Sequence, residues 1–168
     1  MGQKTHPLGF RLVTVQDHRS IWFSNYNQYS TLLQEDDKIR TSLSSKIKPA
    51  SISKISIVRD TTGNKIKLDI HSARPGILVG QAGSGIGDIY KYLKKSLPLQ
   101  RQIEINVVEV TNPDREANLI ADYIVEQLEK RIAFKRAMRR AIQRAQDANV
   151  EGIKVQISGR LNGAEIAR

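Results

Sequence analysis

Five glycines fall within twelve residues of this 168-residue chain, in the segment PGILVGQAGSGIGDIYKYLKK that spans residues 75–95. Glycine adopts backbone conformations that other residues avoid, so such a cluster marks a tight turn or a close approach of two backbones. Residues 84–96 then place apolar side chains at helical spacing, and the helix breaker Pro98 follows. A glycine-rich turn that leads into a helix commonly binds phosphate, from a nucleotide cofactor or from a nucleic-acid backbone.

Two nucleotide-binding motifs fit this segment poorly. A P-loop requires Gly-Lys-Ser or Gly-Lys-Thr, and neither tripeptide occurs in the sequence. A dinucleotide fingerprint would begin at Gly83 and would place Asp88 where its third glycine should stand. A carboxylate there would repel the pyrophosphate, and the parallel βαβ context is missing. We therefore predict that the protein uses no cofactor.

Alternating apolar residues on both sides of the glycine segment predict a sheet. Residues 51–60 and 65–71 alternate apolar with polar side chains and are separated by the turn sequence at residues 61–64, and residues 102–110 alternate in the same way. A helix over residues 32–47, ended by Pro49, precedes them. This order predicts an α+β domain, a three-stranded sheet with helices on one face.

The tetrapeptide Gly80-Gln81-Ala82-Gly83 lies between two predicted helices, within this order of elements. Glycines in such a turn let an RNA backbone approach the main chain, and the amides at the following helix start face its phosphates. This is the arrangement of the KH loop, which clamps about four nucleotides. An ordinary tight turn between two helices is the alternative interpretation. The nearby cations Lys91, Lys94 and Lys95 would supply the positive charge that the loop itself lacks.

The charge of the chain favours a nucleic-acid partner. Lysine and arginine number 27 against 17 aspartate and glutamate residues, which gives a formal net charge of +10. Such an excess releases counterions from a polyanion, although a solvated basic surface without a partner is the simpler alternative. There is no cysteine, and the three histidines show no metal-ligand spacing. No apolar run approaches the roughly 18 residues of a membrane span, so we expect a soluble intracellular protein.

A boundary is predicted at residues 111–114, where Asn112 can cap a helix that Pro113 begins. Its apolar stripe runs through Ala117, Ile120, Ala121, Ile124 and Leu128, and a second stripe runs through Phe134, Ala137, Met138, Ala141 and Ala145. The two stripes are rotated relative to each other, so we expect a break near residues 130–133. Residues 152–159 alternate again and predict one more strand.

Seven positive charges fall within fifteen residues of the second helical segment, and no acidic residue occurs from Arg131 to Gln146. The cations form two rows at four-residue spacing, Arg131-Lys135-Arg139 and Arg136-Arg140-Arg144. Like charges at this spacing repel by a few tenths of a kcal/mol per pair, about 0.2–0.5. A polyanion along the helix would reverse that effect, whereas a solvated face would not. We predict a nucleic-acid contact here.

The chain resembles bacterial-type ribosomal protein three of the small subunit over essentially its whole length. The segments that match are MGQKTHPLGFRL, ARPGILVGQAGSGI, QLEKRIAFKRAMRRAIQRA and GIKVQISGRLNGAEIAR. The starting GFRL and the stretch IWFSNYNQY are more similar to plastid members. The family often has lysines between the loop glycines, whereas this chain has Gln81 and Ala82. Its members continue beyond the equivalent of Arg168, so we expect the chain to be truncated.

This resemblance implies a type II KH domain followed by the start of a second αβ domain. It implies an N-terminal arm at residues 1–30, the KH domain at residues 31–111 and the second domain at residues 112–168. The expected RNA-binding residues of the KH domain are Gly80, Gln81, Ala82, Gly83, Lys91, Lys94 and Lys95. The expected messenger-binding residues of the basic helix are Arg131, Lys135, Arg136, Arg139, Arg140 and Arg144. Of these, Lys135, Arg136 and Arg139 match the family positions that line the entrance of the messenger RNA channel.

The function implied is that of a structural constituent of the small ribosomal subunit. Its partners would be small-subunit ribosomal RNA in the head, messenger RNA, and ribosomal proteins ten and fourteen, in a plastid rather than a bacterial ribosome and without a membrane. A free KH-type RNA-binding regulator or assembly factor is one alternative, and a nucleic-acid-processing enzyme is another. We predict that the protein is not an enzyme, because no nucleophile, acid pair or metal cluster accompanies the basic residues.

Overall fold

The computed structural model describes residues 3–46, 50–60, 64–98, 101–161 and 163 of the chain. The predicted helix end at Pro49 and the turn residues 61–63 lie outside them. The structure divides into two compact units, residues 1–109, called unit 1, and residues 110–168, called unit 2.

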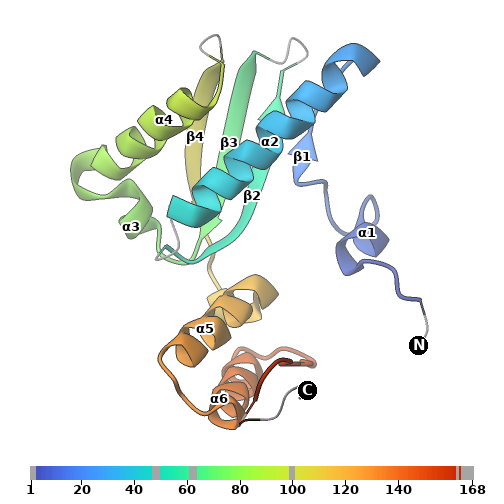
Figure 1. Cartoon of the computed structure of the whole chain (residues 1–168), viewed down its shortest axis with the longest axis vertical. Coiled ribbons are helices and arrows are strands. Elements are labelled where there is room, and N and C mark those ends of the chain that lie inside the picture. Colours follow the sequence, from blue (N-terminus) through green and yellow to red (C-terminus); the bar gives the residue numbers. More distant parts are fainter. Residues whose placement is uncertain (1–2, 47–49, 61–63, 99–100, 162, 164–168) are drawn as a thin grey trace. The chain divides into compact units, whose positions relative to one another are not determined.

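Unit 1 contains a four-stranded sheet in the order β1-β2-β3-β4 (Figure 1). The strands are β1 at Ser20–Ile21, β2 at Ile52–Arg59, β3 at Lys65–Ser72 and β4 at Gln102–Glu109. The hairpin β2-β3 is antiparallel, while β4 runs parallel to β3 and β1 runs parallel to β2. The three strands that the alternation predicted are therefore present and adjacent.

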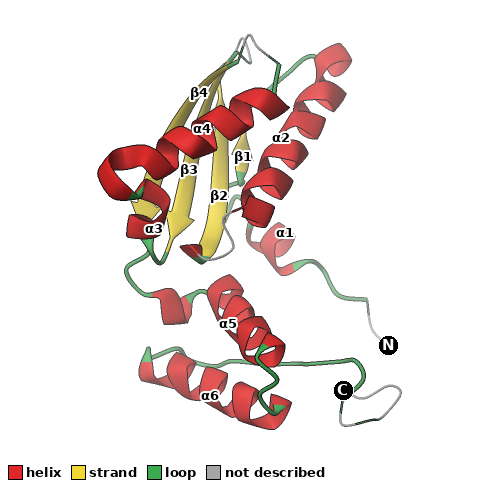
Figure 2. Ribbon diagram, turned by 60° about the vertical axis from the view of Figure 1, so that its left-hand side comes forward, coloured by secondary structure: helices red, strands yellow, loops and turns green. Residues whose placement is uncertain are grey.

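Helices α2 at Tyr26–Lys46, α3 at Pro75–Val79 and α4 at Ser84–Ser96 cover one face of this sheet, as Figure 2 shows. The alternate residues of β2 and β3 that face them are buried, because a pleated strand turns every second side chain to the same side. The fully buried aliphatic side chains of this core are Ile39, Leu43, Ile57, Ile66, Leu68, Ile70, Leu78 and Leu93.

The N-terminal region differs from the sequence prediction. Residues 1–30 were expected to be irregular, but they contain the short helix α1 at Pro7–Arg11, the edge strand β1 and the first turn of α2. The expected three-stranded sheet therefore gains a fourth strand. Strand β1 forms because the backbone N–H of Ile57 donates to the carbonyl of Arg19, at 2.8 Å. Local periodicity cannot reveal such a contact between distant segments.

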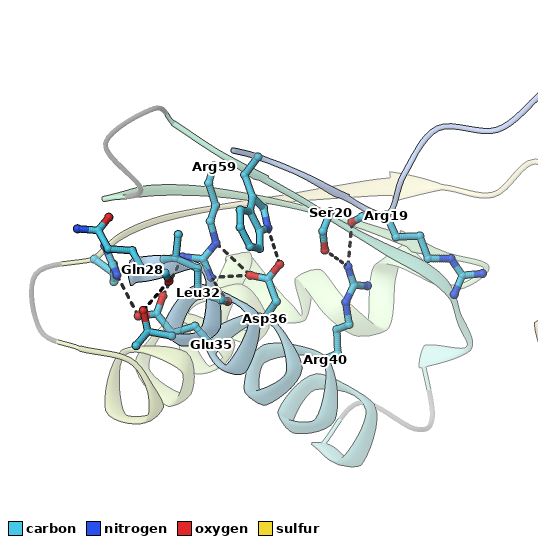
Figure 3. Close-up of polar contacts among 11 residues, drawn as sticks. Arg19, Ser20, Gln28, Leu32, Glu35, Asp36, Arg40 and Arg59 are labelled. Carbon is cyan, nitrogen blue, oxygen red and sulfur yellow. Dashed lines mark hydrogen bonds and ion pairs between the residues drawn. The ribbon is translucent and has the colours of Figure 1, made fainter. Parts of the chain in front are cut away.

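A cluster of charged side chains fastens α2 to the hairpin end of the sheet (Figure 3). We call it the Arg59 cluster; it consists of Trp22, Glu35, Asp36, Arg59 and Arg101. The guanidinium of Arg59 donates to Glu35 Oε2 at 2.8 Å and to Asp36 Oδ1 at 2.5 Å. Arg101 donates to the other oxygen of Glu35 at 3.0 Å, and the indole of Trp22 donates to Asp36 Oδ2 at 2.8 Å.

Arg40 of α2 links β1 to β2. Arg40 donates to the carbonyls of Ile55 and Arg19, at 2.7 and 2.8 Å, and to the hydroxyl of Ser20 at 2.7 Å (Figure 3). Burial lowers the pKa of Arg40, the nearby Asp36 carboxylate raises it, and Arg19 lowers it. The guanidinium stays charged at neutral pH, because arginine is not deprotonated in proteins.

Unit 2 consists of a short 3₁₀ turn, η3 at Pro113–Arg115, and two helices that lie side by side, α5 at Ala117–Glu129 and α6 at Phe134–Asp147 (Figures 1 and 2). The break predicted near residues 130–133 is confirmed. The predicted helix start at Pro113 is wrong, because the extended backbone of Glu116 separates η3 from α5.

The predicted stripe of α6 is confirmed, since Ala137, Ala141 and Ala145 are buried. The stripe of α5 is shifted, because Leu119 and Ile124 are buried while Ala117 and Ala121 are exposed.

The strand predicted at residues 152–159 is not formed in the described part of unit 2. Its side chains do alternate, with Ile153, Val155 and Ile157 half-buried and the residues between them exposed. A strand also requires a neighbour that accepts and donates its ladder hydrogen bonds, and the described residues of unit 2 provide none. Separately, no helix within the described ranges is long and apolar enough to cross a membrane.

Candidate nucleic-acid interface

The glycine loop, residues 80–83, joins α3 to α4 as the sequence predicted. Gly80 has φ +66° and Gly83 has φ +81°, conformations that favour glycine over any residue with a Cβ atom. A Cβ on Gly80 would also lie 2.9 Å from the backbone nitrogen of Gly85. Gln81, between these glycines, is exposed. Both glycines are thus required by the turn itself, before any ligand is considered.

A third glycine of the segment has a role that the sequence did not reveal. A Cβ on Gly85 would lie 2.3 Å from the carbonyl oxygen of Leu78 and 3.1 Å from that of Val79, so α3 and α4 cross with their backbones in contact. The glycine count signalled a close backbone approach, but it could not show which glycine was needed. A Cβ on Gly87, by contrast, would meet no atom within 4 Å.

The three lysines assigned to the loop lie on the second half of α4. Lys91, Lys94 and Lys95 are all exposed. Lys91 lies 4.0 Å from Asp88, and the ammonium of Lys94 lies 5.8 Å from the centre of the Tyr90 ring. At about 1.5 Å of rise per residue, Lys91 is about 12 Å along the helix from Gly83. The loop amides and these lysines would therefore contact different phosphates.

The basic helix places four cations on its outer side. Lys135, Arg136, Arg139 and Arg140, called the basic face, are exposed, and the buried alanines of α6 lie on the opposite side. Within the described ranges, none of the four forms an ion pair. The basic face is therefore available to a polyanion.

The other two predicted cations of this helix are placed differently. Arg131 is exposed, but it lies in the connection between α5 and α6 with φ +58°. Because it is outside α6, it does not extend the row through Lys135 and Arg139. Arg144 turns toward η3 and α5. Its guanidinium lies 2.6 Å from Asp114 Oδ1 and 4.4 Å from the centre of the Tyr123 ring.

In the part of the chain that the structure describes, no group of three or more His, Cys, Asp or Glu side chains could hold a metal ion. The neighbouring acidic residues Glu35 and Asp36 of unit 1 are buried and bonded to Arg59. A carboxylate pair engaged in this way supports the fold. The exposed lysines and arginines of the two units, and the amides of the glycine loop, can bind phosphate.

Two family models match the chain. The model of the KH domain matches residues 38–115, and the model of the C-terminal domain of ribosomal protein S3 matches residues 124–168. The KH match includes the glycine loop and all three long strands of the sheet. The second match includes α6 with its basic face.

Individual relatives align with the whole chain. The small ribosomal subunit protein uS3c of Thalassiosira pseudonana is 60% identical over 168 residues, which are 100% of this chain and 78% of the relative. The uS3c protein of Rhodomonas salina is 56% identical, with 100% and 76% covered. The small ribosomal subunit protein uS3 of Thermosynechococcus vestitus is 54% identical, with 100% and 70% covered.

Proposed function

The chain belongs to the ribosomal protein S3 family of structural, non-enzymatic components of the small ribosomal subunit, and on this premise we propose two RNA contacts for it. Unit 1 binds small-subunit ribosomal RNA in the head of the subunit. The basic face of unit 2 binds messenger RNA at the entrance of its channel. Neither contact involves catalysis.

The basic face of α6 is the observation that carries the proposal. Its four cations lie within six residues and face solvent without an ion pair in the described ranges. Lys135 and Arg136 also lie in the first turn of the helix, where the helix dipole disfavours positive charge. The arrangement costs the isolated protein stability, and a polyanion along the helix would offset that cost.

The glycine loop supports the contact with ribosomal RNA. Its two positive-φ glycines carry no side chains, so a phosphate backbone can approach the main chain at Gly80 and Gly83 and the amides at the start of α4. The lysines of α4 lie farther along the same helix, and they extend this contact to neighbouring phosphates. We propose residues 31–111 as the KH domain that makes the contact, residues 1–30 as its arm and residues 112–168 as the start of the second domain.

The messenger contact is tested with the triple variant Lys135→Ala, Arg136→Ala, Arg139→Ala in ribosomes that carry the full chain. Subunit assembly should stay close to normal, because these side chains are exposed. Ribosomes should slow at a stable messenger hairpin and translate an unstructured messenger almost normally. Because phosphates carry no sequence information, the slowing should be the same for hairpins of different sequence and equal stability.

The matched control removes three exposed lysines of unit 1, Lys38, Lys54 and Lys67, and so lowers the net charge equally. It should leave passage through the hairpin unchanged. Equal slowing of the triple variant on both messengers would indicate a general assembly defect. Normal passage through the hairpin would show that the basic face does not contact messenger.

The glycine loop is tested with the double variant Gln81→Asp, Ala82→Asp, which places two carboxylates where phosphate is expected. Binding to ribosomal RNA and incorporation into subunits should fall because of charge repulsion. The neutral control Gln81→Asn, Ala82→Ser should bind like the unaltered chain. If the Asp variant also binds normally, the loop has only a structural role.

We also propose the plastid ribosome as the location and ribosomal proteins ten and fourteen as neighbours in the head. Several relatives carry the name uS3c, which supports the location, although a cyanobacterial relative is nearly as similar. Fractionation of plastids followed by cross-linking of their small subunits tests both points. Recovery of the chain outside the plastid would contradict the location, and cross-links only to other proteins would contradict the neighbours.

A further inference from the structure

Arg144 belongs to the basic helix by sequence, but its side chain is engaged within unit 2. Its guanidinium contacts Asp114 of η3 at 2.6 Å and lies over the ring of Tyr123 of α5 at 4.4 Å. The side chains of Arg144 and Asp114 are 43% and 35% exposed, so both are partly shielded from water. We call these three residues the Arg144 latch. It joins all three elements of unit 2.

A second contact holds the same end of α6. Arg115, next to Asp114 in η3, donates from Nε to the carbonyl of Ala148 at 2.8 Å. Ala148 is the C-cap residue of α6, where unpaired carbonyls and the negative end of the helix dipole favour a cation. Both charged side chains of η3, Asp114 and Arg115, therefore contact the C-terminal end of α6.

These contacts limit how α6 can rotate about its own axis. The fully buried side chains of α6 are alanines, which are small, and its larger apolar side chains Phe134, Met138 and Ile142 are only half-buried. Alanine contacts alone define the rotation of a helix weakly, whereas an ion pair and a cation–π contact to two other elements define it directly. The direction in which the basic face points follows from that rotation, because Arg140 lies one turn from Arg144.

We propose that Asp114 and Tyr123 are positioning residues for the RNA contact of the basic face, acting through Arg144. Arg144 orients the helix, and the RNA is bound by the outward cations. The inference rests on the proposed messenger contact. Under this proposal Arg144, unlike the four cations of the basic face, does not contact messenger RNA.

The first test measures hydrogen exchange in the free full chain. Asp114→Asn should accelerate exchange of the amides of Ala148 and Val150, at the end of α6, by about two- to fivefold, the range expected for a partly exposed ion pair. Adding Tyr123→Leu should raise the acceleration to about tenfold, because the cation–π contact is also lost. Exchange in β3 of unit 1 should not change. Unchanged exchange at α6 would overturn the proposal.

The second test uses ribosomes and a charge-reversed pair, Asp114→Arg with Arg144→Glu. Asp114→Asn should slow passage through a messenger hairpin, and the conservative Asp114→Glu should not. The reversed pair should restore passage in part, although the positive charge at position 144 is gone, because it re-forms the ion pair but not the cation–π contact with Tyr123. Restored exchange with persistently slow passage would show that Arg144 itself binds RNA, which overturns the positioning role.

The two proposals fail in distinguishable ways. If the triple alanine variant of the basic face passes hairpins normally, the messenger contact is wrong, and the positioning role falls with it whatever the exchange rates show. If that variant is slow while Asp114→Asn passes hairpins normally, the messenger contact stands and the positioning role is wrong.

Discussion

Units 1 and 2 use the same residue type in opposite ways. In unit 1, the side chain of Arg59 is 0% exposed and is bonded to two carboxylates. In unit 2, Arg139 is exposed, and no described residue forms an ion pair with it. The charge of the first arginine is neutralised inside the fold, whereas no described residue neutralises the charge of the second, for which we propose a contact with RNA. The same residue type therefore serves folding in one place and, in our proposal, binding in the other.

The cores of the two units differ in the size of their buried apolar side chains. Unit 1 buries large aliphatic side chains from a sheet and from three helices. The described part of unit 2 buries Leu119 and Ile124 of α5 against the alanines of α6. Because stabilisation scales with the apolar area removed from water, at about 25 cal/mol per Å², the described residues of unit 1 gain more from apolar burial than those of unit 2. Polar contacts such as the Arg144 latch matter more in unit 2.

The largest effect is expected from Arg59→Met. The substitution leaves Glu35 and Asp36 buried without their main counter-charge, which typically costs about 3–5 kcal/mol. The midpoint of urea unfolding should fall accordingly. Trp22, the single tryptophan of the chain, donates to Asp36 and so reports this region by fluorescence.

The matched control is Arg139→Met in unit 2, which removes an exposed arginine. It should change the free energy of unfolding of unit 1 by less than about 0.5 kcal/mol, as expected of surface substitutions. Similar losses in the free energy of unfolding for both variants would contradict this difference between a buried and an exposed arginine.

A smaller effect is expected from Gly85→Ala. The new Cβ would lie 2.3 Å from the carbonyl oxygen of Leu78, so α3 and α4 must move apart. Overpacking of this kind costs about 1–3 kcal/mol, and the shifted loop should also bind RNA less tightly. Gly87→Ala is the control, since open space surrounds that position within α4. It should stabilise unit 1 by about 0.5–1 kcal/mol, and equal losses at both positions would argue against the close crossing.

The smallest effect concerns Asp122 of α5. The residue as a whole is exposed, and partial burial raises the pKa of its carboxyl above the ordinary value of 3.8. The folded state then holds the proton more tightly, so the contribution of Asp122 to the stability of unit 2 is most favourable below the ordinary pKa and is lost as the pH rises through the raised pKa. Hydrogen exchange in α5 should show that Asp122→Asn gains stability relative to the unaltered chain over this range. Parallel pH profiles would contradict the shift.

Much of unit 1 could be predicted from the sequence because its signals are local. Strict alternation located the hairpin β2-β3 and the strand β4, and glycine chemistry located the turn between α3 and α4. The strand β1 and the Arg59 cluster could not be predicted, because they depend on contacts between residues far apart in the chain. Gly85 was visible only as one glycine among five.

Unit 2 was predicted less well for related reasons. The spacing of the alanines correctly identified the buried side of α6, and hence the outward direction of Lys135, Arg136 and Arg139. Sequence spacing alone placed Arg144 in a binding row, and only its contacts with Asp114 and Tyr123 distinguish it from the others. The prediction of a strand at residues 152–159 was wrong for the described residues. Alternation shows that a segment could form a strand, but it does not show whether a second strand lies beside it.

We expect the basic face to bind RNA and to contribute no stabilisation to the fold. The most direct test is the dependence of RNA affinity on salt, measured with the full chain and a single-stranded RNA. Each phosphate contact contributes about 0.7 to the slope of log K against log salt, so the triple alanine variant at Lys135, Arg136 and Arg139 should lower the slope by about 2. Hydrogen exchange in α5 and α6 of the same variant should not accelerate, because the three side chains are exposed. An unaltered slope, or faster exchange in these helices, would contradict this expectation.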